Sequence, residues 1–182
     1  MVVPCSAMVL ACPNSTSASR RPALSMRPML LSVWAARYVG EPVRAILRRI
    51  QNDLFDIGAD LCRPERSGLK VEPLRLQETQ VTWLEAMIDE HNAGLGPLTS
   101  FVLPGGSEAS ALLHIARTIT RRAEREIAEL AFQEPVTPAV IRYMNRLSDL
   151  LFVLARFEND SGRGDVLWHP GEHRDPASPP AG

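Results

Sequence analysis

The sequence is poor in cysteine and has no long apolar run, and each shortage excludes a class of protein. Its three cysteines, at positions 5, 12 and 62, form no C-x-x-C pair and lie at no ligand spacing from a histidine. We therefore expect neither a zinc site nor a disulfide framework, and a reducing cytoplasm fits this cysteine usage. No run approaches the roughly 18–20 apolar residues that a membrane-spanning helix needs, so a soluble protein without membrane contact is expected.

Neither sign of charge is in excess. The 182 residues include 20 Lys and Arg against 21 Asp and Glu, so the chain has no basic footprint for a nucleic acid. Apolar residues make up 45% of the chain, which is enough for one core that needs no disulfide or metal support. One domain is therefore expected.

Residues 1–36 lack Asp, Glu, Lys and Gly altogether, while they hold four of the 15 prolines. A lipoprotein leader ending at Cys12 is disfavoured because no basic residue precedes the short apolar stretch and Pro4 interrupts it. We expect three parts: an aberrant, poorly ordered segment at 1–36, a helical domain at 37–168, and a disordered tail at 169–182, with the chain beyond Gly162 already mostly extended.

Apolar residues at steps of three and four predict four amphipathic helices, at 41–62 and at about 76–95, 108–132 and 138–159. Ser107 is the expected N-cap of the third helix, and Thr137 with Pro138 begins the fourth. With no convincing strand, the class is all-α, an antiparallel bundle of four or five helices. The buried stripe predicted for the third helix consists of Leu112, Ile115, Ile119, Ala123 and Ile127.

The third helix carries Arg117, Arg121, Glu124 and Arg125 at i, i+4, i+7 and i+8, so these side chains share one face. Guanidinium groups bind phosphate oxygens in pairs and never deprotonate, which suits a polyphosphate, and Glu124 can orient an arginine. The alternative is a solvated helix face with i,i+4 ion pairs.

On the fourth helix, Asn145, Arg146, Ser148 and Asp149 form a polar cluster in an apolar surrounding. Asn145 and Ser148 can hydrogen-bond a nucleotide while Asp149 holds an arginine; alternatively the cluster is a buried network that fixes helix register.

Three further positions carry large or titratable side chains. Phe101, on a loop before Pro104, is either a plug at the bundle end or an apolar wall for a ligand. We interpret His114 as a packed core histidine, and Trp83 and Trp168 as packing residues; no metal site is expected.

Four segments in order carry a family resemblance: RIQNDLFDIGADL at 49–61, FVLPGG at 101–106, ARTITRRAER at 116–125 and YMNRLSDLLF at 143–152. Together they resemble the PduO-type ATP:cob(I)alamin adenosyltransferases over about residues 37–168. The resemblance implies a five-helix bundle of the cobalamin adenosyltransferase type, a homotrimer, and active sites between adjacent subunits. It also implies ATP and cobalamin as substrates, with Mg²⁺ accompanying ATP, and a cobalamin reductase or an adenosylcobalamin-dependent enzyme as partner.

The same resemblance implies a reaction and residue roles. Co(I) attacks the ribose 5′ carbon of ATP, and triphosphate leaves. Arg117 would serve the subunit interface and the nucleotide site, Arg121 and Arg125 the triphosphate, and Glu124 and Asn145 the nucleotide pocket. Phe101 would shape the corrinoid site by displacing the lower axial ligand of cobalamin, which makes Co(II) easier to reduce.

The sequence departs from this family at its start. The family's Gly/Thr-rich phosphate loop and its acidic first-helix motif, which pairs with the arginine matching Arg117, are both missing. Read one base earlier, the codons of Met8-Val9 and of Trp34-Ala35 each give glycine, so we hypothesise that residues 1–36 are translated out of frame. We therefore expect an adenosyltransferase with impaired ATP binding. The alternatives are a non-catalytic corrinoid-binding or chaperone bundle, and a structural bundle whose arginine face docks acidic partners.

Overall fold

The computed structural model describes residues 21–63 and 73–174. In these ranges the chain forms five helices. The described residues form no strands, and one isolated antiparallel bridge joins Val102 to Leu167. The prediction of an all-α bundle is confirmed. The helices are α1 (Arg21–Ala35), α2 (Glu41–Cys62), α3 (Glu78–Asn92), α4 (Glu108–Ala131) and α5 (Pro138–Phe157).

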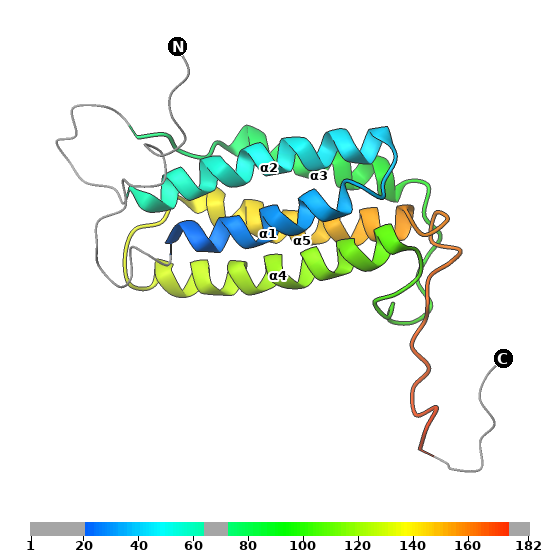
Figure 1. Cartoon of the computed structure of the whole chain (residues 1–182). Helices are drawn as coiled ribbons and strands as arrows, with labels where there is room; N and C mark the ends of the chain where they lie inside the picture. Colours follow the sequence, from blue (N-terminus) through cyan, green and yellow to red (C-terminus); the bar gives the residue numbers. More distant parts are fainter. Residues whose placement is uncertain (1–20, 64–72, 175–182) are drawn as a thin grey trace.

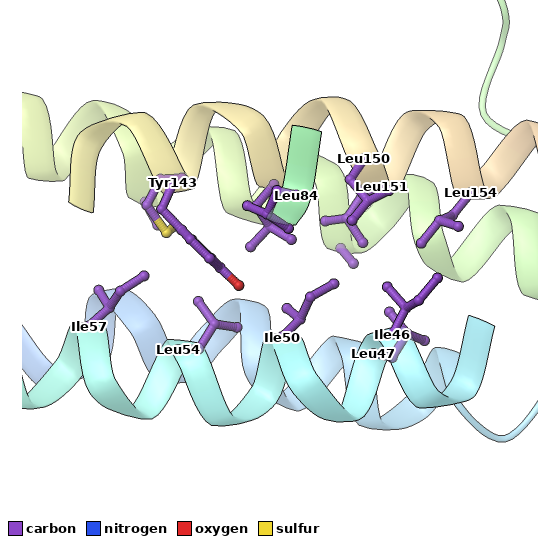
Figure 2. Packing of buried hydrophobic residues seen from close by; sticks show 14 of the residues in the cluster. Ile46, Leu47, Ile50, Leu54, Ile57, Leu84, Tyr143, Leu150, Leu151 and Leu154 are labelled. Atoms are coloured by element: carbon purple, nitrogen blue, oxygen red, sulfur yellow. The ribbon is translucent and has the colours of Figure 1, made fainter. Parts of the chain in front are cut away.

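The five helices lie side by side as a bundle (Figure 1). Helix α5 packs against α3 and α4, while α1 packs against α2 and α4. Helix α2 reaches α5 through the core: Figure 2 shows the α2 residues Ile50, Leu54 and Ile57 facing Tyr143 of α5. Each such apolar side chain contributes about 1.5–3 kcal/mol on burial, so this layer is a main source of the fold's stability.

The apolar stripes that the three- and four-residue spacing predicts for α2 and α5 are confirmed, because all of their residues are buried. They are Val43, Ile46, Leu47, Ile50, Leu54, Ile57 and Leu61 on α2, and Val140, Tyr143, Met144, Leu147, Leu150, Leu151 and Leu154 on α5. Local signals also act where expected at two helix starts. Ser107 Oγ accepts a hydrogen bond from Ser110 N at 3.1 Å, and Pro138 occupies the first turn of α5. Thr137 precedes α5, but its hydroxyl donates to Asp60 at 2.8 Å instead of capping the helix. Helix α3 is shorter at both ends than the range of 76–95 predicted.

Helix α1 was not expected: it lies within residues 1–36, which the sequence suggested to be an aberrant, poorly ordered segment. Whether this segment is aberrant stays a prediction. An internal proline such as Pro28 removes a backbone donor and costs a helix about 3 kcal/mol. Packing offsets this cost, since Ala35 is buried and Met29 and Leu31 pack against the core. Residues 1–20 lie outside the described residues, and the division of the chain at residues 36 and 168 stays a prediction.

Part of the buried stripe predicted for α4 is wrong. Ile115 is 47% exposed, and the residues that face the core instead are one position away, namely Leu113 and Ala116. The helix also buries three polar side chains, Ser110, His114 and Thr120. Thr120 Oγ1 donates to the Ala116 carbonyl at 2.9 Å. Because these polar positions face inward, the most apolar stripe of the sequence was not the most buried one.

The chain beyond Gly162 was expected to be mostly extended or disordered. Residues 165–168 contain no helix and form one β-bridge, as an extended chain does, but they are held in place by specific contacts. Asp165 forms an ion pair with Arg156 at 2.7 Å, both side chains being almost fully buried. Leu103 N donates to Val166 O at 2.8 Å, which holds the returning chain against the loop before α4. Residues 175–182 lie outside the described residues.

The cysteine and membrane expectations have different outcomes. Cys62, the last residue of α2, is disulfide-bonded, whereas the cysteine count argued against a disulfide framework. Among the helices of the described ranges, none has the length and hydropathy to cross a bilayer.

A buried polar cluster joins α2, α3 and α5 inside the apolar core. Asp53 accepts hydrogen bonds from Tyr143 Oη at 2.9 Å and from Gln80 Nε2 at 2.8 Å. Burial, together with the neighbouring Asp53 carboxylate, raises the pKa of Tyr143 well above its ordinary value. Tyr143 therefore remains a neutral donor, as Asp53 requires.

We expect Tyr143→Phe to lower the free energy of unfolding by about 1–3 kcal/mol, because it leaves one oxygen of the buried Asp53 without a donor. Urea denaturation measures the change. Tyr38→Phe is the matched control, since Tyr38 is exposed, and it should change stability by less than about 0.5 kcal/mol. Equal stabilities for the two variants would contradict the proposed weight of this hydrogen bond.

Candidate active site

Three arginines stand along one face of α4. Arg117, Arg121 and Arg125 follow one another at four-residue steps, which places them about 6 Å apart along the helix axis. Within residues 21–63 and 73–174, none of the three takes part in a hydrogen bond or ion pair, whereas Arg122 between them pairs with Glu126 at 2.8 Å. A solvated face with i,i+4 ion pairs is therefore not what this row forms. The row offers three guanidinium groups to an anion.

Arg117 is the least exposed member of the row. Its guanidinium carbon lies 5.1 Å from the centroid of the Phe152 ring on α5. Burial and the charge of Arg121 lower the pKa of Arg117, while Asp149 acts in the opposite direction. The lowered pKa means that the positive charge is less favourable here than in water, although the group stays protonated. An anion bound along the row would relieve this cost.

A chain of polar contacts joins the arginine face to α5. Asn145 Nδ2 donates to Glu124 Oε1 at 2.8 Å, and Arg146 donates to Asn145 Oδ1 at 2.7 Å. Arg146 in turn pairs with Asp149 at 3.3 Å. The structure thus brings Glu124 and Asn145 together beside the arginines, as the sequence suggested. Their amide and carboxylate can orient a polar ligand on this face.

Ser148 lies apart from that face. It is buried, and its hydroxyl donates to the backbone carbonyl of Asn145 at 2.9 Å. A hydroxyl already bonded inside its own helix does not reach an external nucleotide in this arrangement. Because this hydrogen bond lies within α5, it does not fix the register between α4 and α5 either.

Phe101 stands on the loop between α3 and α4, and it is 76% exposed. A plug at the end of the bundle would be buried, so this exposure favours an apolar wall for a ligand. Its ring meets Trp168 edge to face, with 5.8 Å between centroids. Trp168 therefore packs against Phe101, as its interpretation as a packing residue required, although it too is partly exposed.

Two further expectations are confirmed within the bundle. His114 is a packed core histidine: it is buried beside Phe152, and burial followed by the charge of Arg117 lowers its pKa. Trp83 is half-buried under the guanidinium of Arg49, 3.9 Å from the ring centroid. In the described part of the chain, no group of three or more His, Cys, Asp or Glu side chains is arranged to hold a metal ion.

Sequence reasoning missed the groups that hold the Phe101 loop. Arg156 and Asn159 lie in and just after the last turn of α5, and Asp165 follows in a Pro/Gly-rich stretch. Arg156 Nη2 donates to the Gly96 carbonyl at 2.9 Å, and Asn159 Oδ1 accepts from Ser107 N at 3.1 Å. The available signal was an arginine directly after the apolar run 150–155 of α5.

Comparisons with known proteins give a consistent result. The family model described as "Cobalamin adenosyltransferase" matches residues 28–158. The corrinoid adenosyltransferase of Mycobacterium tuberculosis (strain ATCC 25618 / H37Rv) is 51% identical over 148 residues, which cover 79% of this chain and 76% of that protein. The corrinoid adenosyltransferase of Bacillus subtilis (strain 168) is 48% identical over 128 residues, covering 69% and 64%.

A solved structure shares the fold. It is a variant PduO-type ATP:corrinoid adenosyltransferase from Lactobacillus reuteri complexed with cobalamin and ATP, at a TM-score of 0.75 and 30% identity. The similarity covers 84% of this chain and 83% of that one. Sequence and structure agree in their assignment: this chain belongs to the cobalamin adenosyltransferase family.

Proposed function

We propose that this chain is an ATP:corrinoid adenosyltransferase, which transfers the 5′-deoxyadenosyl group of ATP to cob(I)alamin and releases triphosphate. The observation that carries the proposal is the row of Arg117, Arg121 and Arg125, none of which forms a hydrogen bond or an ion pair among the described residues. The M. tuberculosis relative is named a corrinoid adenosyltransferase, and the L. reuteri structure was solved in complex with cobalamin and ATP.

The reaction requires the protein to stabilise the leaving group, triphosphate. The electron pair of Co(I) forms a bond to the 5′ carbon, the carbon–oxygen bond breaks, and its electrons leave with triphosphate. Negative charge therefore grows on the phosphate chain in the transition state. Arg121 and Arg125 are exposed and free to bind its oxygens, and preorganised cations at such a position lower the barrier by several kcal/mol.

The remaining residues of the row complete a nucleotide site in this proposal. Arg117 lies half-buried where the row begins, and the carboxylate of Glu124 and amide of Asn145 would contact the nucleoside. In this proposal a second subunit closes the site against Arg117, and the assembly is the homotrimer that the family resemblance implies. The exposed Ile115 of α4 supports such an interface, since a large apolar side chain there is open to a partner.

The corrinoid would bind against Phe101. An exposed aromatic ring on a loop offers an apolar surface, and such a surface keeps water and other donors away from the lower face of cobalt. The Co(II) state then accepts an electron more easily, which a cobalamin reductase in the cytoplasm would supply. Phe101 would therefore favour reduction of cobalt by excluding water and other ligands from it.

Mg²⁺ has no site of its own in the proposal. The described part of the chain holds no group of three or more His, Cys, Asp or Glu side chains that could bind a metal ion by themselves. Any Mg²⁺ would arrive on the phosphates of ATP. No step of the reaction is assigned to it here.

A second function is favoured by one observation, the composition of α1. This helix packs against α4 but contains no acidic residue, so it gives Arg117 no carboxylate partner. With the first 36 residues out of frame, the ATP half of the site would be impaired while the corrinoid half stays complete. The chain would then be a non-catalytic corrinoid-binding bundle. Sequencing the DNA across codons 1–40 tests the frame directly.

The purified 182-residue chain should consume chemically reduced cob(I)alamin in the presence of Mg-ATP and form adenosylcobalamin. The visible spectrum follows both species. Formation of adenosylcobalamin supports the proposed transfer. If cobalamin produces a spectral shift but no adenosylcobalamin forms, the second function is the correct one. If there is no spectral response at all, both are wrong.

A further inference from the structure

We propose that the C-terminal segment 165–168 is a positioning element of the corrinoid site, in which Asp165 fixes the Phe101 loop and Trp168 orients the Phe101 ring. The inference rests on the proposed function, because it assigns residues to the substrate wall of that same site. Neither residue lies on the arginine face of α4, so the two halves of the site can be tested separately.

Backbone contacts tie the two segments together. Trp168 N donates to Phe101 O at 2.8 Å, and Leu103 N donates to Val166 O at 2.8 Å. These bonds enclose the antiparallel bridge between Val102 and Leu167. Ser100 Oγ also donates to Trp168 O at 2.6 Å. The conformation of the loop at Phe101 is therefore set by a segment more than 60 residues later in the chain.

A buried ion pair anchors this returning segment to α5. The Asp165 and Arg156 side chains are 4% and 7% exposed, and Arg156 Nε donates to Asp165 Oδ2 at 2.7 Å. Asn159 Nδ2 donates to the other carboxylate oxygen of Asp165 at 3.2 Å. Because both oxygens of Asp165 are engaged, the start of segment 165–168 has little freedom to move.

The same two α5 residues also hold both ends of the Phe101 loop. Arg156 reaches the Gly96 carbonyl at one end, and Asn159 accepts from Ser107 N at the other. Gly106 makes the second contact feasible: a Cβ there would lie 2.2 Å from Asn159 Oδ1, and its φ of +86° suits glycine alone. The loop and the returning segment thus share one anchor.

The aromatic pair is the functional end of this arrangement. Trp168 is 43% exposed and supports the far more exposed Phe101 ring at its edge. Without this support the Phe101 side chain has several rotamers available to it. Part of the corrinoid binding energy would then be spent on ordering the ring, which weakens corrinoid binding and leaves ATP binding unchanged.

The test compares Trp168→Ala, Trp168→Phe and Asp165→Asn with the full chain. The first readout is the dissociation constant of cob(II)alamin, measured by visible spectroscopy; the second is KM for cob(I)alamin against KM for ATP. Trp168→Ala should weaken corrinoid binding about tenfold and change KM for ATP by less than about twofold, since one aromatic contact is lost. Trp168→Phe should recover most of the affinity.

Asp165→Asn should raise the cob(II)alamin dissociation constant several-fold and speed hydrogen exchange at the Leu103 amide, because the anchor of the segment is weakened. Asp160→Asn is the matched control: Asp160 pairs with Arg163 in the same turn, but both side chains are exposed. It should leave affinity and exchange as they are. Trp168→Ala does not touch the anchor, so it remains informative if Asp165→Asn fails to fold.

Equal effects of Trp168→Ala on both KM values, or none on corrinoid affinity, would overturn the positioning role. The proposed function fails separately: a full chain that makes no adenosylcobalamin, yet binds cob(II)alamin in a Trp168-dependent way, refutes transfer and supports positioning. A full chain that does not bind cob(II)alamin at all overturns both.

Discussion

Arg121→Gln is expected to lower kcat/KM for ATP by about 10²–10³-fold, because it removes a fixed cation from the charge that develops on the leaving triphosphate. The side chain is exposed and has no hydrogen bond or ion pair among the described residues, so its loss should cost the fold little. Its charge also lowers the pKa of Arg117. The remaining arginines should therefore keep their protonation state and report only the lost contact.

The measurement is adenosylcobalamin formation at several ATP concentrations, together with calorimetric binding of inorganic tripolyphosphate. The second probe reports on the arginine row even if the full chain turns over slowly. Arg142→Gln is the matched control, since Arg142 is exposed and pairs with Glu78 on α3, away from the row. The assignment of the row to triphosphate would be wrong if both substitutions had the same effect on tripolyphosphate binding.

Asp60→Ala should lower the free energy of unfolding by about 3–5 kcal/mol, the range for breaking a buried ion pair by removing one partner. The Asp60 carboxylate is almost fully buried and accepts from Arg75 Nη1 at 2.6 Å, Leu76 N at 2.9 Å and Thr137 Oγ1 at 2.8 Å. It thereby joins the end of α2 to the starts of α3 and α5. Its removal leaves Leu76 N and Thr137 Oγ1 without this acceptor, and it leaves Arg75 Nη1 with only the Asp60 backbone carbonyl, at 3.1 Å.

Thermal and urea denaturation measure this loss. Glu78→Ala is the control, because Glu78 also pairs with an arginine but both side chains are exposed, and such pairs contribute at most about 1 kcal/mol. Asp60→Asn should fall between the two, since an amide keeps one acceptor oxygen. A loss below about 1 kcal/mol for Asp60→Ala would show that the three donors find other partners.

The spacing of apolar residues was enough to predict four of the five helices. The start of α2 and both ends of its apolar stripe follow from residues such as Val43 and Leu61, which are all buried as expected. Helix α1 could not be predicted in this way, because Pro28 and the absence of charge argue against a helix locally. It forms through packing against α2 and α4, and packing is a property of the whole chain.

In the candidate site too, features within one helix could be predicted from the sequence, whereas contacts between distant segments could not. Four-residue spacing was enough to place Arg117, Arg121 and Arg125 on one face, because a helix fixes the relation between spacing and direction. The ion pair of Arg156 with Asp165 and the contact of Phe101 with Trp168 join segments with no periodic relation. Such long-range contacts depend on where the chain turns back, and single-sequence patterns do not encode that.

Helix α4 runs without glycine or proline from Glu108 to Ala131, and its first turn follows directly on the anchored loop that carries Phe101. Because the helix is unbroken, it fixes the distance and the angle between the Phe101 loop and the arginine row. Adding one residue to its first half would rotate the arginine row by about 100° and shift it by about 1.5 Å. In the proposed function, the corrinoid binds at the Phe101 loop and the phosphates bind at the arginine row, so an insertion in this helix would misplace one against the other. We therefore expect length differences among functional members of the family to fall in the connections between helices.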